Sequence, residues 1–340
     1  MTQFLQLPLQ EQADAIKVVA EFMDLPAAVL EKDVWKCWVL GHLFKIPSEV
    51  SMAFKGGTSL SKVFDAISRF SEDVDITLHH RDLFKDFDPF LSGTSRSKQD
   101  KASEILKAAA LDHVKGVIYP YLREKLSEEF DRPEYSIEID PENGEKLYLK
   151  YPSELGHYNY FSEQVLLEFG GRNTVEPCTV YSISPYLKIY PNIEAEFPSA
   201  EVNVLSPSRT FWEKATLIHS ECSRGHFKTG ADRISRHWYD LTKLQEHQIG
   251  QESLSQDFGL LEQVVQYKKV FYRSAEAKYD DCLSGKFRLV PVGPMLKDLE
   301  VDYKKMIGAR MFWQDPAPFD KIIERLRQLE AQINEKLSYQ

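Results

Sequence analysis

The first fifty residues carry apolar side chains at helical spacing. Ala15, Val18, Val19 and Phe22 recur every three or four positions, and a second apolar series runs over positions 34–43. This period predicts two amphipathic helices. Pro26 lies between the two series and marks the start of the second helix, because the first turn of a helix does not need the N–H group that proline lacks.

From about residue 46 the pattern changes to short apolar runs that are typical of strands. A run over 51–54 meets Gly56 and Gly57, and apolar positions 60, 63, 64 and 67 follow. This order predicts a strand, a tight turn and a helix capped by Thr58 and Ser59. A second strand is expected over 74–78, a polar loop over 81–104 and a long helix over 103–126.

The middle of the chain predicts more sheet and the remainder predicts helices. Alternating side chains over 135–139 and 147–151, joined by Pro-Glu-Asn-Gly, indicate a β-hairpin. The more continuously apolar run over 164–170 indicates an interior strand. From residue 207 onward the period is helical, with helices expected over 207–222, 231–248, 253–272, 294–308 and 317–337.

These elements predict an α+β protein in three parts. We expect N-terminal helices over 1–45 that pack on the core, an α/β core over 46–205 and a helical domain over 206–340. The chain has 340 residues, of which 43% are hydrophobic and 28% charged. This length and composition allow a sizeable core and exclude both a disordered chain and a small disulfide-stapled scaffold.

Charge and cysteine content exclude several further classes. The 42 Lys and Arg against 52 Asp and Glu give a net charge of −10, which disfavours a protein coated with basic surface for unselective nucleic-acid binding. Four cysteines lie far apart without a CxxC pair, so neither a disulfide framework nor a cysteine zinc site is indicated. The chain shows no secretory signal pattern and no apolar stretch of about 18 residues. The cytoplasm is therefore the expected compartment.

The candidate chemistry lies between residues 54 and 75. Glycines at a strand-to-helix turn let backbone N–H groups approach an anion, so Gly56 and Gly57 could hold a phosphate. Asp73 and Asp75 flank Val74 at the start of a strand, and the alternation of side chains along a strand points both carboxylates to one face, where they suit a divalent metal. Each feature alone has a plain alternative, an ordinary turn and an exposed acidic strand edge. Their occurrence within twenty-two residues makes coincidence less plausible.

At this point the sequence resembles the AbiEii/AbiGii toxin family within the DNA polymerase β-like nucleotidyltransferase superfamily. The superfamily's first motif is Gly-Gly or Gly-Ser, followed after a short helix by Asp-x-Asp. The resemblance covers about residues 28–245 and rests on the segments Glu31-Lys32-Asp33-Val34-Trp35, Phe54-Lys55-Gly56-Gly57-Thr58-Ser59-Leu60, Arg69-Phe70-Ser71-Glu72-Asp73-Val74-Asp75 and Arg209-Thr210-Phe211-Trp212-Glu213-Lys214-Ala215.

The resemblance implies a polymerase β-like core with a mixed sheet and a cleft that binds an NTP and two Mg²⁺ ions. Asp73 and Asp75 would hold the metal, and the triphosphate would lie against the turn formed by Gly56, Gly57, Thr58 and Ser59. Lys62 could reach the same phosphates or could face solvent.

A third metal ligand is expected on a neighbouring strand, and Glu168 is our choice. This single acid interrupts an apolar strand, and burying a carboxylate without a partner would be costly. The alternatives for Glu168 are the solvated end of the strand or an ion pair with Arg172. Glu194 and Glu196, read as a same-face pair, compete for the role of third ligand.

Two residues of the helical part complete the expected catalytic set by resemblance. Lys214 would neutralise triphosphate charge, although a lysine on a helix is usually solvated. Asp240 lies in Arg233-Ile234-Ser235-Arg236-His237-Trp238-Tyr239-Asp240-Leu241, which looks like the closing motif of the family. Asp240 could instead form a weak ion pair with Arg236 one helical turn away.

The resemblance implies the toxin half of a bacterial toxin–antitoxin or phage-defence pair, with a separately encoded antitoxin as partner. The expected acceptor is RNA, in particular a tRNA end. Between residues 206 and 244 seven Lys or Arg oppose four acids, a surplus of three, and the expected RNA-binding residues are Arg224, Lys228, Arg233 and Arg236. The alternatives are an inactive module that binds a nucleotide or a protein, and a transferase that modifies a protein.

Overall fold

The computed structural model describes the whole chain except residues 1, 86–87, 92–93, 156–162, 256–257 and 340. The described residues form two compact units. The first unit holds residues 1–63, 70–87 and 104–205, and the second holds 64–69, 88–103 and 206–340. The second unit therefore takes two short segments from within the part of the chain that we assigned to the α/β core.

A mixed sheet of seven strands forms the centre of the first unit, in the order β3-β4-β5-β2-β1-β7-β6. Two neighbouring pairs, β2 with β5 and β1 with β7, are parallel, and the other pairs are antiparallel. This sheet confirms the predicted α+β class. The strands are β1 (Met52–Lys55), β2 (Asp73–His79), β3 (Ser136–Ile139), β4 (Lys146–Lys150), β5 (Gln164–Asn173), β6 (Cys178–Ile183) and β7 (Ala200–Leu205).

The predicted hairpin is confirmed as β3 and β4, and the predicted interior strand is confirmed as β5, which lies between β4 and β2. Two strands had no counterpart among the predicted elements. The edge strand β6 exposes most of its side chains, so its sequence carries little apolar signal, and β7 connects it to β1.

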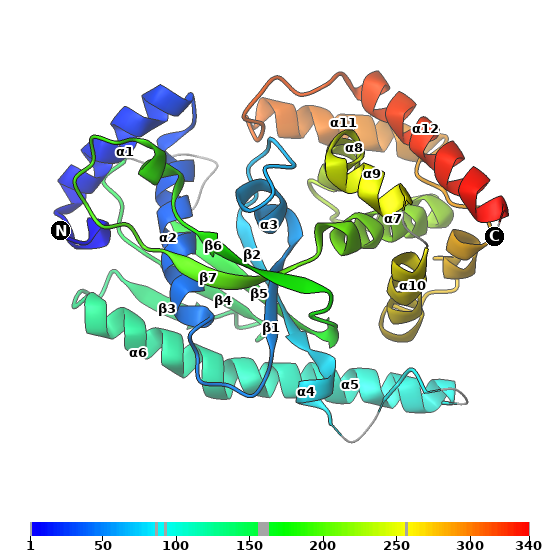
Figure 1. Cartoon of the computed structure of the whole chain (residues 1–340), viewed down its shortest axis with the longest axis horizontal. Coiled ribbons are helices and arrows are strands. Elements are labelled where there is room, and N and C mark those ends of the chain that lie inside the picture. The colour runs from blue at the N-terminus through cyan, green and yellow to red at the C-terminus, as the bar shows by residue number, and fades with distance from the viewer. Residues whose placement is uncertain (1, 86–87, 92–93, 156–162, 256–257, 340) are drawn as a thin grey trace. The chain divides into compact units, whose positions relative to one another are not determined.

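The helices of the first unit are α1 (Leu9–Met23), α2 (Ala27–Leu43), the short α3 (Gly56–Lys62) and α4 (His80–Leu83), the part of α5 (Arg96–His113) from Glu104 on, and α6 (Tyr119–Glu129). A π-helical turn, Val114–Ile118, connects α5 to α6, and a 3-10 turn covers Tyr186–Ile189. The predicted polar loop therefore ends at Arg96, earlier than expected. In Figure 1, α2 and α6 lie beside the sheet, where α2 packs on β5 and β7 and α6 on β3.

The second unit is helical and is built around α7 (Pro207–Arg224), which packs against α8 (Arg236–Glu246), α9 (Gln248–Ser255) and α10 (Gly259–Phe271). The 3-10 turn Tyr279–Leu283, α11 (Pro294–Gly308) and α12 (Phe319–Ser338) follow. Trp212, Trp238 and Leu326 lie in its buried core. The predicted helix over 253–272 is divided between α9 and α10. None of the described helices combines the length and the apolar character that a membrane span requires.

Candidate active site

The three predicted metal-binding carboxylates lie on one face of two neighbouring strands. Along β2, Asp73 and Asp75 are partly exposed, whereas Val74 between them is buried. On the parallel strand β5, Glu168 lies directly opposite Asp75 in the register, and its two neighbours along the strand are buried. Residues paired in register share a face of the sheet, so the structure brings Asp73, Asp75 and Glu168 together on the accessible side.

Gly56 lies against the carboxylate of Asp75. A side-chain carbon at position 56 would fall 1.9 Å from Asp75 Oδ2, and the backbone there has a φ of +77°. Both observations require glycine, because other residues cost energy in this backbone region and any side chain would occupy the space of the carboxylate. The close approach of turn and acid pair that the motif implies is therefore built into the backbone.

The helix after this turn begins earlier and ends earlier than predicted. It spans Gly56–Lys62, with Lys55 at its N-cap position and no side-chain cap. The predicted Thr58 and Ser59 cap is wrong, because both hydroxyls bond elsewhere: Thr58 donates to the carbonyl of Asp73, and Ser59 donates to the carbonyl of Gly56 at 3.0 Å. These bonds fix the turn to the start of β2 and leave backbone N–H groups as the donors that the turn offers to an anion.

Glu168 forms an ion pair with Lys146 of the adjacent strand β4, which faces it in the register. Lys146 donates a hydrogen bond to Glu168, and this bond raises the pKa of Lys146. The side chain of Glu168 is 34% exposed, so the pair is open to solvent. Sequence reasoning named Arg172 as the alternative partner and overlooked Lys146, although the alternation along the predicted hairpin strand could have placed this lysine beside β5.

The competing pair does not share a strand face. Glu194 lies outside the strands, and Glu196 forms an isolated bridge with Gln3 of the N-terminal segment. Its backbone N–H donates to Thr2 O at 2.9 Å, and its carbonyl accepts from Phe4 N at 2.8 Å. The interpretation of Glu194 and Glu196 as a same-face strand pair is therefore wrong.

Lys62 is buried beneath the turn. Its Nζ lies 2.6 Å from Asp33 Oδ1, 3.0 Å from the carbonyl oxygen of Ser184 and 4.4 Å from the ring centre of Tyr186. The side chain is 2% exposed, so the alternative that it faces solvent is wrong. Asp33 also accepts from the backbone N–H of Tyr186 at 2.8 Å, so this carboxylate joins Lys62 of α3 to α2 and to the turn at Tyr186.

A lysine of α2, Lys36, holds the segment that leads into β2. Lys36 is buried, donates to the carbonyl of Ser71 and lies 4.6 Å from the ring centre of Phe70. Burial, together with the nearby charge of Lys32, lowers the pKa of Lys36 to about 7. Sequence analysis predicted this helix from its apolar residues but gave Lys36 no role. The sequence feature that could have identified Lys36 is that Lys32, Asp33 and Lys36 are charged positions within an otherwise apolar helix.

The second unit contains a buried charge cluster formed by Asp240, Lys214 and Arg69. Asp240 Oδ2 lies 2.8 Å from Lys214 Nζ, and Arg69 donates to both oxygens of Asp240 at 2.6 and 2.7 Å. Burial alone would raise the pKa of Asp240, but the two cations hold it well below the usual range. Burial lowers the pKa of Lys214. Lys214 is thus buried, not solvated, and Arg69 is the partner that sequence reasoning overlooked.

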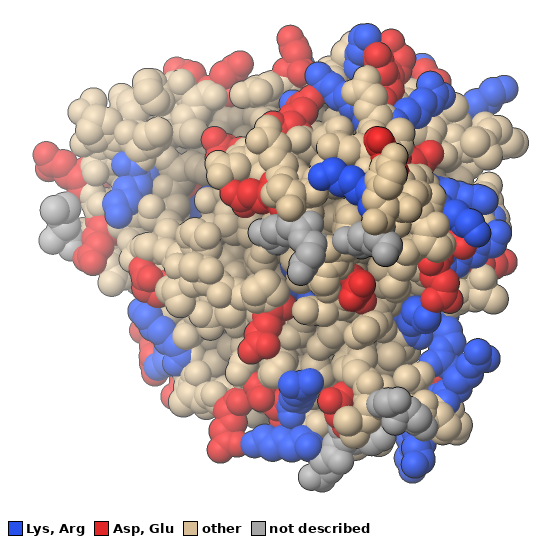
Figure 2. All heavy atoms as spheres, turned by 45° about the vertical axis from the view of Figure 1, so that its right-hand side comes forward, with Lys and Arg blue, Asp and Glu red and all other residues tan. Residues whose placement is uncertain are grey.

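The predicted RNA-binding residues lie along the end of α7, the following segment and the start of α8. Arg224 pairs with Glu221 at 2.6 Å and with Glu276 at 3.6 Å, and Arg233 lies 3.3 Å from Asp232. Lys228 is exposed, and Arg236 is partly exposed. Figure 2 shows basic and acidic side chains interspersed over the face that it presents. RNA binding by these four residues stays a prediction.

The donor set on the sheet suits a hard divalent cation because it consists of carboxylate oxygens alone. Within the described part of the chain, no three Asp, Glu, His or Cys side chains are arranged to hold a metal as they stand. At this site Glu168 is paired with Lys146, so a metal that used Glu168 as a ligand would have to displace this lysine. Asp73 and Asp75 therefore fit as the primary ligands, and Glu168 fits as a ligand that must leave its lysine.

Comparison with known proteins identifies a family and a solved structure of similar fold. Residues 38–325 match the family model described as nucleotidyl transferase AbiEii toxin of type IV toxin–antitoxin systems. Among solved structures, the chain is similar to MenT4, a nucleotidyltransferase toxin from Mycobacterium tuberculosis, with 15% identity, a TM-score of 0.48, and coverage of 95% of this chain and 92% of that chain. No curated protein matches the chain in sequence.

Proposed function

Because the chain belongs to the AbiEii family of nucleotidyltransferase toxins, we propose that it transfers nucleotides from an NTP to an RNA acceptor at the Asp73 and Asp75 face of the sheet. The observation that carries this proposal is the shared face of these two acids with Glu168, which the register places opposite Asp75. If Asp73 and Asp75 were only exposed acids of a strand without a function, the backbone of Gly56 would have no reason to lie against one of their carboxylates.

In the first unit, we assign one set of residues to metal binding, a second to phosphate binding and a third to holding the turn in shape. Asp73 and Asp75 would hold Mg²⁺, with Glu168 as the further ligand. When bound, the ion offsets negative charge on the phosphates and helps to orient them. The N–H groups at the start of α3, from Gly56 and Gly57 onward, donate toward the triphosphate while Thr58 and Ser59 hold the turn in shape.

Lys62 supports this turn from its buried pair with Asp33, so we assign it a positioning role and not direct phosphate contact. In the second unit, Lys214 and Asp240 form the remaining part of the proposed catalytic set, with Arg69 as the partner that orients Asp240. The two cations and the carboxylate are buried, so this cluster joins Lys214 of α7, Asp240 of α8 and Arg69 within the second unit.

The finer assignments rest on chemistry and on the family. An RNA acceptor, with a tRNA end as the first choice, is supported by the basic surplus between residues 206 and 244. The type IV toxin–antitoxin family supports a separately encoded antitoxin as partner. We further propose a role in a toxin–antitoxin or phage-defence pair, which the toxin–antitoxin family supports in its first part alone.

The test is a labelling reaction with the full chain, MgCl₂, total RNA and each NTP labelled at its α-phosphate. Nucleotidyl transfer moves the α-phosphate into the product, so label should enter RNA and be lost on ribonuclease treatment. ATP labelled at the γ-phosphate should give none. Label that survives ribonuclease and is removed by protease would instead show a protein acceptor, and absence of label with all four NTPs would refute the proposal.

A further inference from the structure

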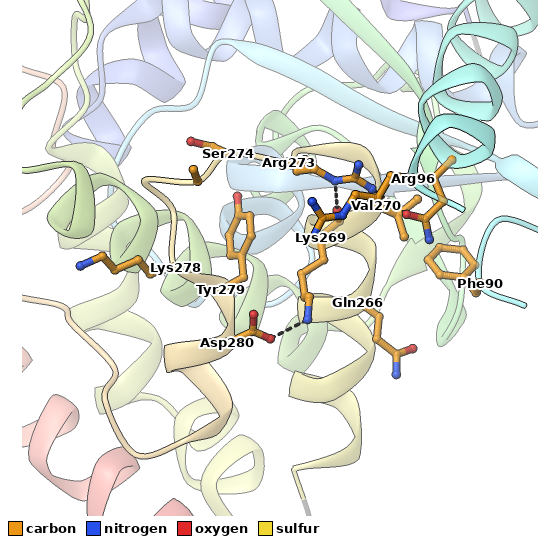
Figure 3. A pocket seen from close by; sticks show the side chains of 12 residues that line it. Phe90, Arg96, Gln266, Lys269, Val270, Arg273, Ser274, Lys278, Tyr279 and Asp280 are labelled. Carbon is orange, nitrogen blue, oxygen red and sulfur yellow. Dashed lines mark hydrogen bonds and ion pairs between the residues drawn. The ribbon is translucent and has the colours of Figure 1, made fainter. Parts of the chain in front are cut away.

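The second unit contains a pocket of about 650 Å³ that none of the proposed catalytic residues lines. Its walls come from the start of α5, the end of α10 and the segment that follows α10. Figure 3 shows Arg96, Lys269 and Arg273 close together on its wall, with Phe90 nearby, whereas Lys278 extends away from them. This volume is in the range of pockets that bind small molecules and cofactors.

The pocket has a surplus of positive charge. Four cationic side chains line it, namely Arg96, Lys269, Arg273 and Lys278, against the single acid Asp280. Asp280 is engaged by Lys269 at 2.5 Å. Arg273 also pairs with Asp100, which does not line the pocket, so Arg96 and Lys278 are the cations of the wall without an acidic partner among the described residues. A concave wall with this surplus of positive charge attracts an anion.

The two arginines differ in how they are held. Arg273 is fixed by Gln99 at 2.6 Å, by Asp100 at 3.3 Å and by the carbonyl of Lys269 at 3.3 Å, so its guanidinium is positioned before any ligand arrives. Arg96 has no side-chain partner among the residues that the structure describes. A guanidinium group matches two oxygens of a phosphate at once, so a phosphate is the anion that this pair fits best.

The pocket also has an apolar side. Phe90 stands 4.4 Å from Tyr267 and 5.7 Å from Phe271, measured between ring centres, and the buried Val270 lines the wall beside them. An aromatic cluster next to cations is the combination that accommodates a nucleobase beside its phosphate. A bare inorganic anion would make no use of this apolar side.

We propose that this pocket binds a nucleotide unit, with its phosphate at Arg96 and Arg273 and its base beside Phe90. The inference rests on the proposed function in that the acceptor strand is the expected source of this unit. A free nucleotide carries the same chemistry, and the experiment separates the two sources. The pocket would then hold the acceptor away from the reacting end and contribute to its selection.

The test measures binding without transfer. A fluorescein-labelled single-stranded RNA of twelve nucleotides is titrated with the full chain in EDTA, with fluorescence anisotropy as the readout. The test variant is Arg96→Gln with Arg273→Gln. The matched control is Arg325→Gln with Arg327→Gln on α12, which likewise removes one ion-paired arginine and one exposed arginine. Both variants change the net charge equally.

We expect the test variant to bind RNA at least about tenfold more weakly than the control, with a salt dependence reduced by about one to two phosphate contacts. Displacement of the RNA by ATP would identify the free nucleotide as a sufficient ligand, and displacement only by unlabelled RNA would identify the strand. Equal binding of RNA and ATP by test variant and control would overturn the proposal. Equal displacement by a polyglutamate peptide of the same charge would do so too.

Failure of the proposed function would look different. Asp75→Asn should bind this RNA like the wild type while transferring nothing, because Asp75 does not line the pocket. If the wild type binds RNA through the pocket but labels no acceptor, the nucleotide site stands and the proposed transfer falls.

Discussion

Replacing Gly56 by alanine tests the closest contact of the candidate active site. The added methyl carbon would fall 1.9 Å from Asp75 Oδ2 and 2.7 Å from Asp75 Cγ, far inside van der Waals contact. The backbone φ of +77° is also unfavourable for alanine. The carboxylate of Asp75 must therefore rotate away, or the turn must move off the strand.

The magnitude follows from these two costs. An alanine at this φ costs roughly 1–2 kcal/mol, and forcing Asp75 off its preferred rotamer costs about 0.5–1.5 kcal/mol more. We expect a loss of about 2–3 kcal/mol in the free energy of unfolding, which leaves most proteins folded. Transfer should fall by about a hundredfold or more, because a displacement of about 1 Å at a reacting centre has that effect.

Urea denaturation and the initial rate of α-phosphate labelling measure the two effects. Gly225→Ala is the control for backbone strain alone, since φ there is +82° and its methyl would meet nothing within 4 Å. Gly170→Ala adds a methyl to β5 with neither strain nor contact. If Gly56→Ala transfers nucleotides at more than half the wild-type rate, the assignment of this turn to the active site is refuted.

Three further predictions concern other charged groups. Glu168→Gln should lower transfer and raise the Mg²⁺ concentration needed, whereas Glu194→Gln and Glu196→Gln should change the rate less than twofold; the reverse ranking would move the third ligand. Asp240→Asn should reduce the free energy of unfolding by about 3–5 kcal/mol, since it leaves two buried cations without their carboxylate, and a loss below about 1 kcal/mol in urea denaturation would contradict the buried cluster. For Lys36 the folded pKa is about 7, and the unfolded value is about 10.4. Between these pH values the unfolded chain binds more protons than the folded protein, so the free energy of unfolding should rise by up to about 1.4 kcal/mol per pH unit. Lys36→Met should remove that rise. An equal slope of the free energy of unfolding against pH in both proteins between pH 7.5 and 9.5 would show that Lys36 does not titrate there.

Much of the fold was predictable because the spacing of apolar residues along the chain shows which face of a helix or strand is buried. The helices α1, α7, α11 and α12 have strong apolar periods, and the predicted strands lie where apolar runs alternate or continue. α2 is buried on almost every side, so its high apolar content, more than its period, marks it as a helix of the core. β6 was not predictable in this way, because an edge strand with exposed side chains carries no apolar pattern. The early end of α3 depends on tertiary contacts: Phe64 and Ile67 continue the helical spacing but pack outside the helix.

The candidate site was predictable where one segment contains both the motif and its geometry. Asp73 and Asp75 share a face because they lie two apart on a strand, and Gly56 is required by a local turn. The partners Lys146 and Arg69 were not predictable, because strand register and long-range packing decide which cation meets which acid. The helical spacing of Asp240 and Arg236 suggested a local pair, but Asp240 bonds to Arg69 and Lys214 instead.

The most direct test of the central claim is the transfer rate of Asp75→Asn, measured with α-labelled NTP, total RNA and MgCl₂. Asp112→Asn, an exposed acid on α5 of the same unit, is the matched control. The carboxylate pair on β2 predicts that Asp75→Asn folds, keeps its thermal unfolding midpoint within a few degrees and loses transfer by at least about a thousandfold, while Asp112→Asn transfers like the wild type. A folded Asp75→Asn variant that labels RNA at the wild-type rate would contradict it.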